Sequence, residues 1–535
     1  MLLAEVNALK GFRSVLCSGC RRWLHFSRIA LYDDYGNKKY YDIGEHPYQR
    51  AYDNAMHDFR RMKRRYLLAK YDYYKRRGRL TYALKSVIDE ELIPVECTFA
   101  IIGGGLVGSA VAFWIKERLR DDDMRLIVLE ADSKFAESTT VLSPGGIWQQ
   151  FSDPVQVQMS LFTAEFLRNA DEHLRILDND IPPFRFTPMN SLFLASNEDT
   201  AKAMEKHHKM QIVSYEALFR ETGASVRLLN KEELQLQFPF MKFDDIVLGS
   251  LGLENGGVFD GWQVLSAFRE RNISLGVQYI KAKVTGFIYE WNTEFDLPEY
   301  QPPEEQWRYK RITRLIIEPQ MTDAAPRPIS ATFMVNCAGA WAGEICDMAG
   351  FGKGSGLMSV PVPIMKKKRY AYIVHCPDGP SLDMPYLFDC SRVWCRREGF
   401  GNLYMCGKIP TAEEDATIDH SNLDVDYDYF DEHIWPMLAK RIPAFEKLKM
   451  KNAWAYYTDE NYYDGSPVIG DYIAQQNFFN IAGFSGLSLQ HAIPAARAIS
   501  EKLLDGAYMN IDTRGFNLHR MLRNKPNETD KCYIY

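Results

Sequence analysis

The pattern of apolar and polar residues changes near residue 97, where it begins to predict buried strands separated by a helix. Residues 98–102 (TFAII) and 126–130 (LIVLE) are short, nearly continuous apolar runs, which are typical of strands buried on both faces of a sheet. Between them, residues 106–120 place apolar side chains at helical spacing. This order predicts a βαβ unit that opens a parallel sheet.

The same strand-to-helix order returns far along the chain, at residues 332–350 and 478–506. Between these pieces lie alternating segments, such as 311–318 (RITRLIIE) and 402–408 (NLYMCGK), which predict strands of a more antiparallel region. We therefore expect an α/β plus α+β protein, with a Rossmann-like nucleotide-binding domain and an inserted, mainly antiparallel sheet domain for a substrate. The nucleotide-binding domain is assigned residues 97–185, 250–290, 330–355 and 455–510, and the inserted domain residues 186–249, 291–329 and 356–454.

The N-terminal part of the chain differs from the rest in charge. Residues 1–30 contain one acidic residue, Glu5, and five lysines and arginines, a composition typical of a mitochondrial presequence; a disordered basic tail is the alternative. Residues 31–96 are a basic, aromatic-rich extension, in which residues 59–80 carry ten basic side chains and one acid, Asp72. This segment fits an anionic membrane face, an acidic partner or RNA, or else it is a solvated helix packed on the main body.

The composition of the whole chain narrows its class. With 535 residues, the chain is long enough for more than one core. Its formal net charge of −6 gives no reason to expect nucleic-acid binding. It has no run of about 18 apolar residues, so any membrane association would be peripheral. Ten cysteines include a single CxxC pair, Cys17 and Cys20, so no metal site is expected, and residues 511–535 are assigned to a polar C-terminal tail.

A glycine-rich turn joins the first predicted strand to the helix. Gly103, Gly105 and Gly108 satisfy the GxGxxG pattern. The first glycine permits the tight turn, the second lets the backbone approach a pyrophosphate, and the third lets the helix pack closely on the strand. Glu130 ends the second strand, 22 residues after Gly108, where a carboxylate can accept hydrogen bonds from a ribose. The turn predicts a bound dinucleotide, although by itself it does not separate NAD from FAD.

Later segments favour FAD over NAD. Residues 137–147 (ESTTVLSPGGI) offer hydroxyl groups and two glycines soon after Glu130, and a flavin ring requires a backbone with few side chains around it. Residues 464–471 and 480–492 supply a second glycine-rich turn at the start of a helix, whose backbone N–H groups could stabilise negative charge on a reduced flavin. The alternative is that these glycines only punctuate ordinary loops.

Several segments resemble the D-amino-acid oxidase superfamily of FAD enzymes, which includes sarcosine oxidase and dimethylglycine dehydrogenase. The resemblance rests on AIIGGGLVGSAVAFW, VLSPGGIWQQFS, ENGGVFDGW, VNCAGAWA and DGSPVIG, and it runs from about residue 97 to about residue 510. It implies a D-amino-acid oxidase type of FAD-binding domain. Three longer segments, which start at Ser143, Val393 and His433, are similar to a mitochondrial subgroup associated with the assembly of respiratory complex I.

The resemblance also implies where FAD would bind, and without a covalent bond, because no cysteine or histidine matches an attachment position. The pyrophosphate would lie at the glycine turn, the ribose at Glu130 and the adenine against the backbone of Val284. Where the subgroup reads GFSGHGLQ, this chain reads GFSGLSLQ, which puts in doubt any chemistry that needs the imidazole but leaves flavin binding intact. The assigned cofactor-binding residues are Gly103, Gly105, Leu106, Val107, Gly108, Glu130, Ser138, Thr139, Ser143, Gly145, Gly146, Val284, Ala338, Gly339, Trp341, Gly483, Gly486, Leu487, Ser488 and Gln490.

The superfamily oxidises a carbon–nitrogen bond by hydride transfer to the flavin, with the substrate carboxylate held by an arginine. The candidate catalytic residues here are Gln150, Arg369, Arg396 and Tyr404, and either arginine would hold the carboxylate. The alternative for each arginine is a salt-bridged position on the surface of a sheet.

Two functions remain as expectations. The first is an FAD-binding protein of the mitochondrial matrix, at most peripheral on the inner membrane, that is required for complex I assembly and binds complex I subunits or assembly intermediates. The altered GFSGLSLQ loop and the basic segment at residues 59–80 favour it. The second is an active amine or amino-acid oxidase or dehydrogenase of the sarcosine or dimethylglycine type, with a small amine or amino acid as substrate and no role in assembly.

Overall fold

The computed structural model describes most of the chain from residue 93 onward. The described residues are 66, 93–119, 124–176, 186–212, 224–291, 310–320, 326–353, 356–472 and 475–527. The expected presequence, the basic segment at residues 59–80 apart from Tyr66, and the last eight residues of the expected tail lie outside them. What the sequence indicates for those segments therefore stays a prediction.

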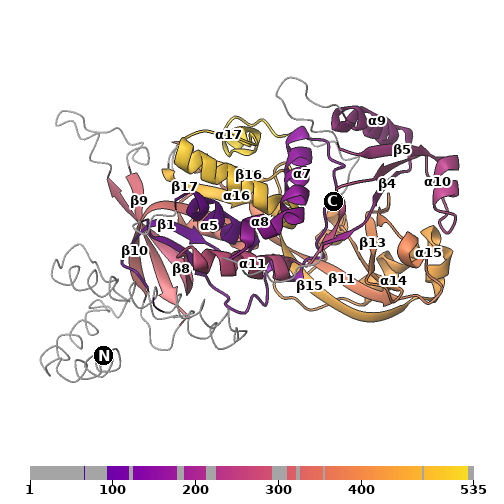
Figure 1. Ribbon diagram of the computed structural model, residues 1–535, viewed down its shortest axis with the longest axis horizontal. Helices are drawn as coiled ribbons and strands as arrows, with labels where there is room; N and C mark the ends of the chain where they lie inside the picture. Colours follow the sequence, from indigo (N-terminus) through magenta and orange to yellow (C-terminus); the bar gives the residue numbers. More distant parts are fainter. Residues whose placement is uncertain are drawn as a thin grey trace, which may run out of the picture.

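A seven-stranded sheet forms the nucleotide-binding domain (Figure 1, left). Its strands are β1 (Glu96–Ile102), β2 (Leu126–Glu130), β8 (Gln278–Trp291), β9 (Lys310–Pro319), β10 (Arg327–Asn336), β16 (Val468–Tyr472) and β17 (Gln475–Ala482). β1 lies between β2 and β10 and is parallel to both, and β17 is parallel to β10. The helix α5 (Leu106–Arg118) connects β1 to β2, so the predicted βαβ unit is confirmed.

Both faces of this sheet are covered, which explains the continuous apolar run in β1. Phe99 and Ile101 point into one core, and Ala100 and Ile102 point into another. The first core is shared with the helices α5, α7 (Pro154–Arg168), α11 (Gly261–Ser274) and α16 (Ser488–Asp505), and the second with α12 (Ala342–Met348). A strand buried on both sides needs apolar residues at successive positions, rather than at alternate ones.

An eight-stranded sheet forms the inserted domain (Figure 1, right). In order across the sheet, its strands are β15 (Lys449–Asn461), β11 (Ile364–His375), β14 (Leu403–Lys408), β13 (Val393–Glu398), β12 (Tyr386–Phe388), β4 (Ser191–Ala195), β6 (Leu248–Gly252) and β5 (Val226–Asn230). Only the β12–β4 pair is parallel among the described strands of this sheet. The mainly antiparallel character is therefore confirmed, and with it the predicted fold class.

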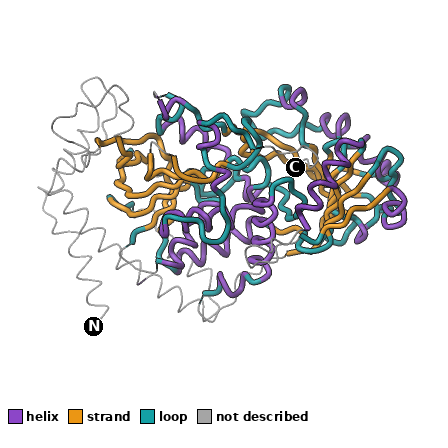
Figure 2. The backbone as a smooth tube through the Cα atoms, turned by 90° about the horizontal axis from the view of Figure 1, so that it is seen from above, coloured by secondary structure: helices purple, strands orange, loops and turns teal. Residues whose placement is uncertain are grey.

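Short elements complete the described structure. The helices α14 (Asp428–His433) and α15 (Trp435–Arg441) cover one face of the eight-stranded sheet over a third core. Seen from above, strands gather at the two ends of the molecule, with helices and loops between them (Figure 2). The remaining elements are α6 (Thr139–Leu142), α8 (Ala170–Leu174), α9 (Glu198–Ile212), α10 (Lys231–Gln237), α13 (Ala412–Asp415), α17 (His519–Leu522), and the two-stranded pair β3 (Phe186–Pro188) and β7 (Gly257–Phe259).

The expected domain limits differ from the observed ones in three places. β9 was expected in the inserted domain because its sequence alternates, yet it pairs with β8 and β10 and so extends the nucleotide-binding sheet. β6 and β15 run past the expected limits at residues 250 and 455, within the inserted sheet. Residues 511–527 are not a loose tail, because Ile511, Phe516 and Leu518 are buried against the nucleotide-binding domain.

Candidate functional site

The glycine turn lies where β1, β10 and α5 meet. Gly103 has φ +104°, and a Cβ there would lie 2.3 Å from the carbonyl oxygen of Cys337. A Cβ on Gly108 would lie 2.0 Å from the carbonyl oxygen of Gly103. Both glycines are therefore required by the packing of strand and helix, as the motif predicts for Gly108. At Gly105 a Cβ would lie 3.1 Å from Thr140 Oγ1, which leaves more room.

Glu130 is anchored beside this turn. Its Oε2 accepts a hydrogen bond from the Gly104 N–H at 2.7 Å, and its Oε1 accepts one from the Asp132 N–H at 2.8 Å. Burial raises the pKa of Glu130, and the two backbone donors partly oppose that rise. A carboxylate offers about four acceptor positions, so acceptor capacity remains for ribose hydroxyls. The turn and the carboxylate together are suited to the adenosine diphosphate half of a dinucleotide.

A cavity of about 1010 Å³ lies between the two domains. Its nucleotide-domain wall is formed by the loop at residues 143–146 and the segment at residues 485–490, and its other wall by β11, β12, β13 and β15. The structure brings eight of the sequence-predicted residues to this cavity: Thr139, Ser143, Gly145, Gly146, Arg369, Gly486, Leu487 and Gln490.

The polar groups of the cavity fit a flavin ring. Ser143 Oγ and Gln490 Nε2 are buried and have no hydrogen-bond partner among the described residues, although both residues line the cavity. Gln490 is held in place because its Oε1 accepts a hydrogen bond from the Trp148 N–H at 3.2 Å. Buried polar atoms without a protein partner indicate a ligand that supplies one. The ring nitrogens and oxygens of a flavin meet this need.

The second glycine turn acts differently from the prediction. The N–H groups of Gly483 and Phe484 donate to Asp459 Oδ2, at 2.7 and 3.1 Å, and the Ser485 N–H donates to the Asp459 carbonyl. These donors cannot also serve a flavin, and Gly483 does not line the cavity. The N–H groups at the start of α16 have no acceptor inside the helix, and Gly486, just before the helix, lines the cavity. Any stabilisation of flavin charge would therefore come from the helix start and from the N–H of Gly486.

The other predicted cofactor residues lie around the ends of the nucleotide-binding strands. Leu106 and Val107 begin α5, and Ser138 precedes α6. Ala338, Gly339 and Trp341 follow β10, and the Ala338 Cα would lie 3.1 Å from a Cβ on Gly103. Val284 lies in β8 with its side chain buried, so only its backbone could reach an adenine. Ser488 is the first residue of α16.

Arg369 lines the cavity, but its charge is already compensated. Its guanidinium forms ion pairs with Asp415, at 2.7 Å, and with Glu460. Asp415 also pairs with Lys367 at 2.6 Å. Desolvation acts to raise the pKa of Asp415, but the hydrogen bonds and charges of Lys367 and Arg369 outweigh it and hold that pKa below its usual value. Arg369 is thus better placed to shape the cavity wall than to bind a substrate carboxylate.

Arg396 is buried and does not line the cavity. It pairs with Glu398, and its Nη2 donates to the Pro144 carbonyl oxygen at 2.7 Å. It therefore holds the loop at residues 143–146 against β13. The guanidinium therefore stabilises the loop at residues 143–146, whereas the sequence predicted that it would bind the substrate.

The structure places two of the predicted catalytic residues away from the cavity. Tyr404 lies on the opposite face of the inserted sheet, where its ring packs 4.9 Å from Phe445 and its hydroxyl accepts a hydrogen bond from the Ser381 N–H. Side chains alternate along a strand, and the sequence does not reveal which set faces the cavity. Gln150 is fully buried away from the cavity and forms hydrogen bonds with Ser191 of β4.

The sequence reasoning missed Arg392. This residue lines the cavity at the turn between β12 and β13 and has φ +71°, a left-handed conformation that is unfavourable for arginine. Its Nε donates to the Ile409 carbonyl oxygen at 3.0 Å, and no carboxylate of the described residues lies within ion-pair distance. Burial lowers its pKa, although an arginine stays charged at neutral pH. Only its position in a hairpin turn between cavity-lining strands could have indicated it.

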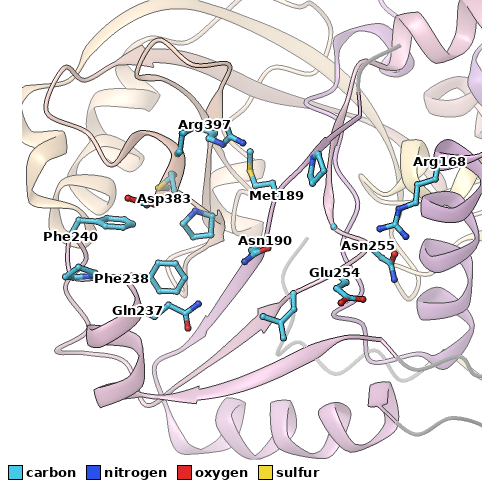
Figure 3. A pocket seen from close by; sticks show the side chains of 17 residues that line it. Arg168, Met189, Asn190, Gln237, Phe238, Phe240, Glu254, Asn255, Asp383 and Arg397 are labelled. Carbon is cyan, nitrogen blue, oxygen red and sulfur yellow. The ribbon is translucent and has the colours of Figure 1, made fainter. Parts of the chain in front are cut away.

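A second cavity, of about 600 Å³, contains none of the predicted site residues (Figure 3). Its lining includes Arg168, Asn255, Asp383 and Arg397. Arg397 faces this cavity while its neighbour Arg396 turns toward Pro144, as alternation along β13 requires. The two cavities therefore lie on different sides of the same strand, and Arg397 offers a matched control for Arg392.

The described part of the chain contains neither a metal cluster nor a membrane-spanning helix. There, no group of three or more His, Cys, Asp or Glu side chains is arranged to hold a metal ion. In the same residues, no helix combines the length and the apolar character needed to cross a bilayer.

Comparison with known proteins gives the family. A family model described as FAD dependent oxidoreductase matches residues 98–502. Relatives from Xenopus laevis and Bos taurus, both named FAD-dependent oxidoreductase domain-containing protein 1, are 39% and 40% identical over 82% and 80% of this chain and 85% of each relative. The mitochondrial sarcosine dehydrogenase of Homo sapiens is 22% identical over 80% of this chain and 42% of that protein.

Solved structures share the fold. The L-proline dehydrogenase of P. horikoshii has a TM-score of 0.64 at 20% identity and covers 81% of this chain and 100% of its own. The glycine oxidase of Geobacillus kaustophilus has a TM-score of 0.58 at 17% identity and covers 79% of this chain and 98% of its own. The resemblance found in the motifs is thereby confirmed. The chain belongs to the FAD-dependent oxidoreductase family, and FAD is the cofactor to which its glycine turn and cavity loops correspond.

Proposed function

We propose that this protein oxidises the carbon–nitrogen bond of a small amine that carries a carboxylate. One observation carries the proposal: Arg392, whose guanidinium has no carboxylate partner among the described residues, lines the cavity together with Gly486 and Gln490. A guanidinium binds a carboxylate through two parallel hydrogen bonds. The rings of Tyr386 and Trp394 line the same wall and would keep water from the reacting atoms.

Each part of the site would have its own role. The glycine turn and Glu130 would hold the adenosine diphosphate, and Ser143, Gly145 and Gln490 would surround the flavin ring. Bound there, FAD would supply the two-electron acceptor for the hydride that leaves the substrate carbon, so that the neutral amine becomes an iminium ion. Arg392 would orient the substrate through its carboxylate. Such a step depends mainly on positioning, so few proton-transferring side chains are needed.

The names of similar proteins support this class of substrate. Sarcosine dehydrogenase, L-proline dehydrogenase and glycine oxidase are named for compounds that carry both an amine and a carboxylate. These proteins are 17% to 22% identical to this chain, so the particular substrate is not carried over from them.

The test compares Arg392→Gln with Arg397→Gln. FAD-loaded proteins are mixed without oxygen with sarcosine, dimethylglycine, glycine or L-proline, and bleaching of the flavin absorbance is followed. We expect Arg392→Gln to raise the KM of the reactive compound roughly 30-fold, equivalent to about 2 kcal/mol. Arg397→Gln should leave it unchanged. If no carboxylated amine bleaches the wild-type flavin, or if both variants behave alike, the proposal is wrong.

We also propose that the protein acts in the mitochondrial matrix, at most peripherally on the inner membrane, in the assembly of complex I. The support is the similarity of three long segments to a mitochondrial subgroup with that association, together with the acid-poor first thirty residues. Its partners would be complex I subunits or assembly intermediates. Turnover at the cavity and an assembly role are compatible, because an FAD domain can both react and present a binding surface.

A rescue experiment tests the assembly role. Cells that lack the protein are supplied with the wild type, with Gly105→Trp or with Gly401→Trp, and assembled complex I is measured on a native gel. Tryptophan at Gly105 would fill the space of the pyrophosphate, whereas Gly401 has open space around it in a surface turn. Rescue by the wild type and Gly401→Trp alone would mean that FAD occupancy is needed. Normal complex I without the protein would contradict the assembly role.

A further inference from the structure

Asp459 is a buried carboxylate behind the second glycine turn. It lies in β15, and only 2% of it is exposed. Its Oδ2 accepts hydrogen bonds from two successive N–H groups, those of Gly483 and Phe484, and its own carbonyl accepts the Ser485 N–H at 2.9 Å. A third point of attachment is the Asn461 N–H, which donates to Ser485 Oγ at 3.2 Å. One end of β15 therefore holds the entire turn.

No cation compensates this carboxylate among the described residues. Lys366 is its cross-strand neighbour on β11, but the Lys366 ammonium lies over the ring of Tyr457, 4.5 Å from the ring centroid. The adjacent Glu460 is paired with Arg369. Among the described residues, backbone N–H groups stabilise the ionised form, namely those of Gly483, Phe484 and Asp459 itself. Burial outweighs them and raises the pKa of Asp459 to about 6.

The turn that Asp459 holds is conformationally demanding. Gly483, Ser485 and Gly486 have φ values of +75°, +51° and +95°, and Ser485 is the only one of the three with a side chain that disfavours this region. The chain then enters α16, whose first turn places Leu487, Leu489 and Gln490 at the cavity. The hydrogen bonds from Asp459 thus fix where the helix begins and how its free N–H groups face the cavity.

We propose that Asp459 is a positioning residue for the cofactor: by holding the turn at residues 483–486, it places the start of α16 at the cavity and sets the affinity for FAD. The inference rests on FAD binding at this cavity, and it does not depend on whether an amine is oxidised there. Asp459 itself does not line the cavity, although its chain neighbours Thr458 and Glu460 do.

The test measures the dissociation constant of FAD, by flavin fluorescence, for the wild type, Asp459→Asn and Glu501→Gln. Glu501 is a matched control, because it is a buried carboxylate that accepts the N–H groups of Met509 and Asn510, at 2.8 and 3.0 Å, at the other end of α16. At about pH 7.5 we expect Asp459→Asn to bind FAD roughly 10-fold more weakly, since charge-assisted hydrogen bonds are replaced by weaker neutral ones. Glu501→Gln should bind like the wild type.

The pH profile separates the proposed role from general damage. Wild-type affinity should fall as the pH is lowered through about 6, because protonation of Asp459 weakens its hold on the turn. Asp459→Asn should lack this component of the pH dependence. Should Asp459→Asn not fold, Ser485→Gly removes the third attachment while easing the backbone, and it should weaken FAD binding severalfold. Unchanged affinity in Asp459→Asn, or an equal loss in Glu501→Gln, overturns the inference; a wild type that binds no FAD overturns its premise.

Discussion

At the scale of single residues, the chemistry of the cavity depends on which charges are already compensated. Arg369 and Lys367 share Asp415, whereas Arg392 has no carboxylate partner among the described residues. Three cations within one cavity thus differ in their capacity to bind an anion. The same criterion singles out Asp459, whose charge is balanced only by backbone donors.

Asp459 should reduce the stability of the cofactor-free protein at neutral pH. Its folded-state pKa of about 6 lies above the usual value of 3.8, so the folded state binds the proton more tightly than the unfolded state does. The stabilisation from this proton is present at low pH and is lost as the pH rises through about 6. We expect Asp459→Asn to raise the midpoint of thermal unfolding of the apoprotein at about pH 7.5, and this gain should disappear near pH 4.

Calorimetry of the apoproteins at several pH values gives the check, and Glu501→Gln again serves as the control. A variant that is less stable than the wild type at neutral pH would contradict the prediction. Higher stability combined with weaker FAD binding would mean that this carboxylate is retained for the cofactor and not for the fold.

At the scale of elements, the glycine turn and the βαβ unit could be predicted because their signals are local. Gly103, Gly105 and Gly108 stand within six residues of one another, and the apolar runs on either side have the length of buried strands. The side chains of the inserted sheet that line the cavity could not be predicted, because the sequence does not show which face of a strand is turned toward the cavity. Tyr404 and Met405 are neighbours in sequence, but they lie on opposite faces of the sheet.

The contact between Asp459 and the second glycine turn could not be predicted from the sequence either. Asp459 lies 24 residues before Gly483, in a strand of the other domain's sheet, and no local pattern connects them. Arg392 was missed for a related reason, because it lies in a turn whose position beside the cavity follows from the whole inserted sheet.

The glycines of the first turn should differ in their tolerance of alanine. Gly108→Ala would place a Cβ 2.0 Å from the Gly103 carbonyl oxygen, backbone that cannot move freely, so we expect a loss of several kcal/mol in stability. Gly105→Ala meets only Thr140 Oγ1 at 3.1 Å and should fold, with weaker FAD binding. Urea unfolding and FAD content are measured for both, with Gly401→Ala as a control. Equal stability of the two variants would contradict this assignment.

At the scale of the whole molecule, the last described residues are part of the site. Pro526 and Asn527 line the FAD cavity, and Arg520 forms a buried ion pair with Asp464 at 2.7 Å. The Asn527 N–H donates to the same carboxylate at 3.1 Å. The segment at residues 511–527 therefore both forms part of the cavity wall and is attached to the nucleotide-binding domain by a buried ion pair.

Loss of the ion pair between Arg520 and Asp464 should destabilise the folded protein. Arg520→Met removes the buried ion pair with Asp464, so we expect a loss of about 3–5 kcal/mol in the free energy of unfolding. Asp464→Asn should restore part of this loss in the double variant, because it removes the charge that Arg520 compensated and keeps an acceptor. Urea denaturation of the wild type, both single variants and the double variant gives the coupling. A double variant as unstable as Arg520→Met would show that lost packing, and not charge, is responsible.

The pairing of β1 with β10 and of β10 with β17 has a consequence for how the protein is made. β1 pairs Cys97 with Ala331, and β10 pairs Met334 with Phe478, so strands that lie side by side leave the ribosome hundreds of residues apart. The sheet cannot be completed, nor its first core fully covered, until β17 and α16 are made in the last fifth of the chain; such long-range contacts slow folding and expose the chain to aggregation. We therefore expect chaperones to assist its folding, and the part of the cavity formed by residues 485–490 can be completed only after most of the chain has been made.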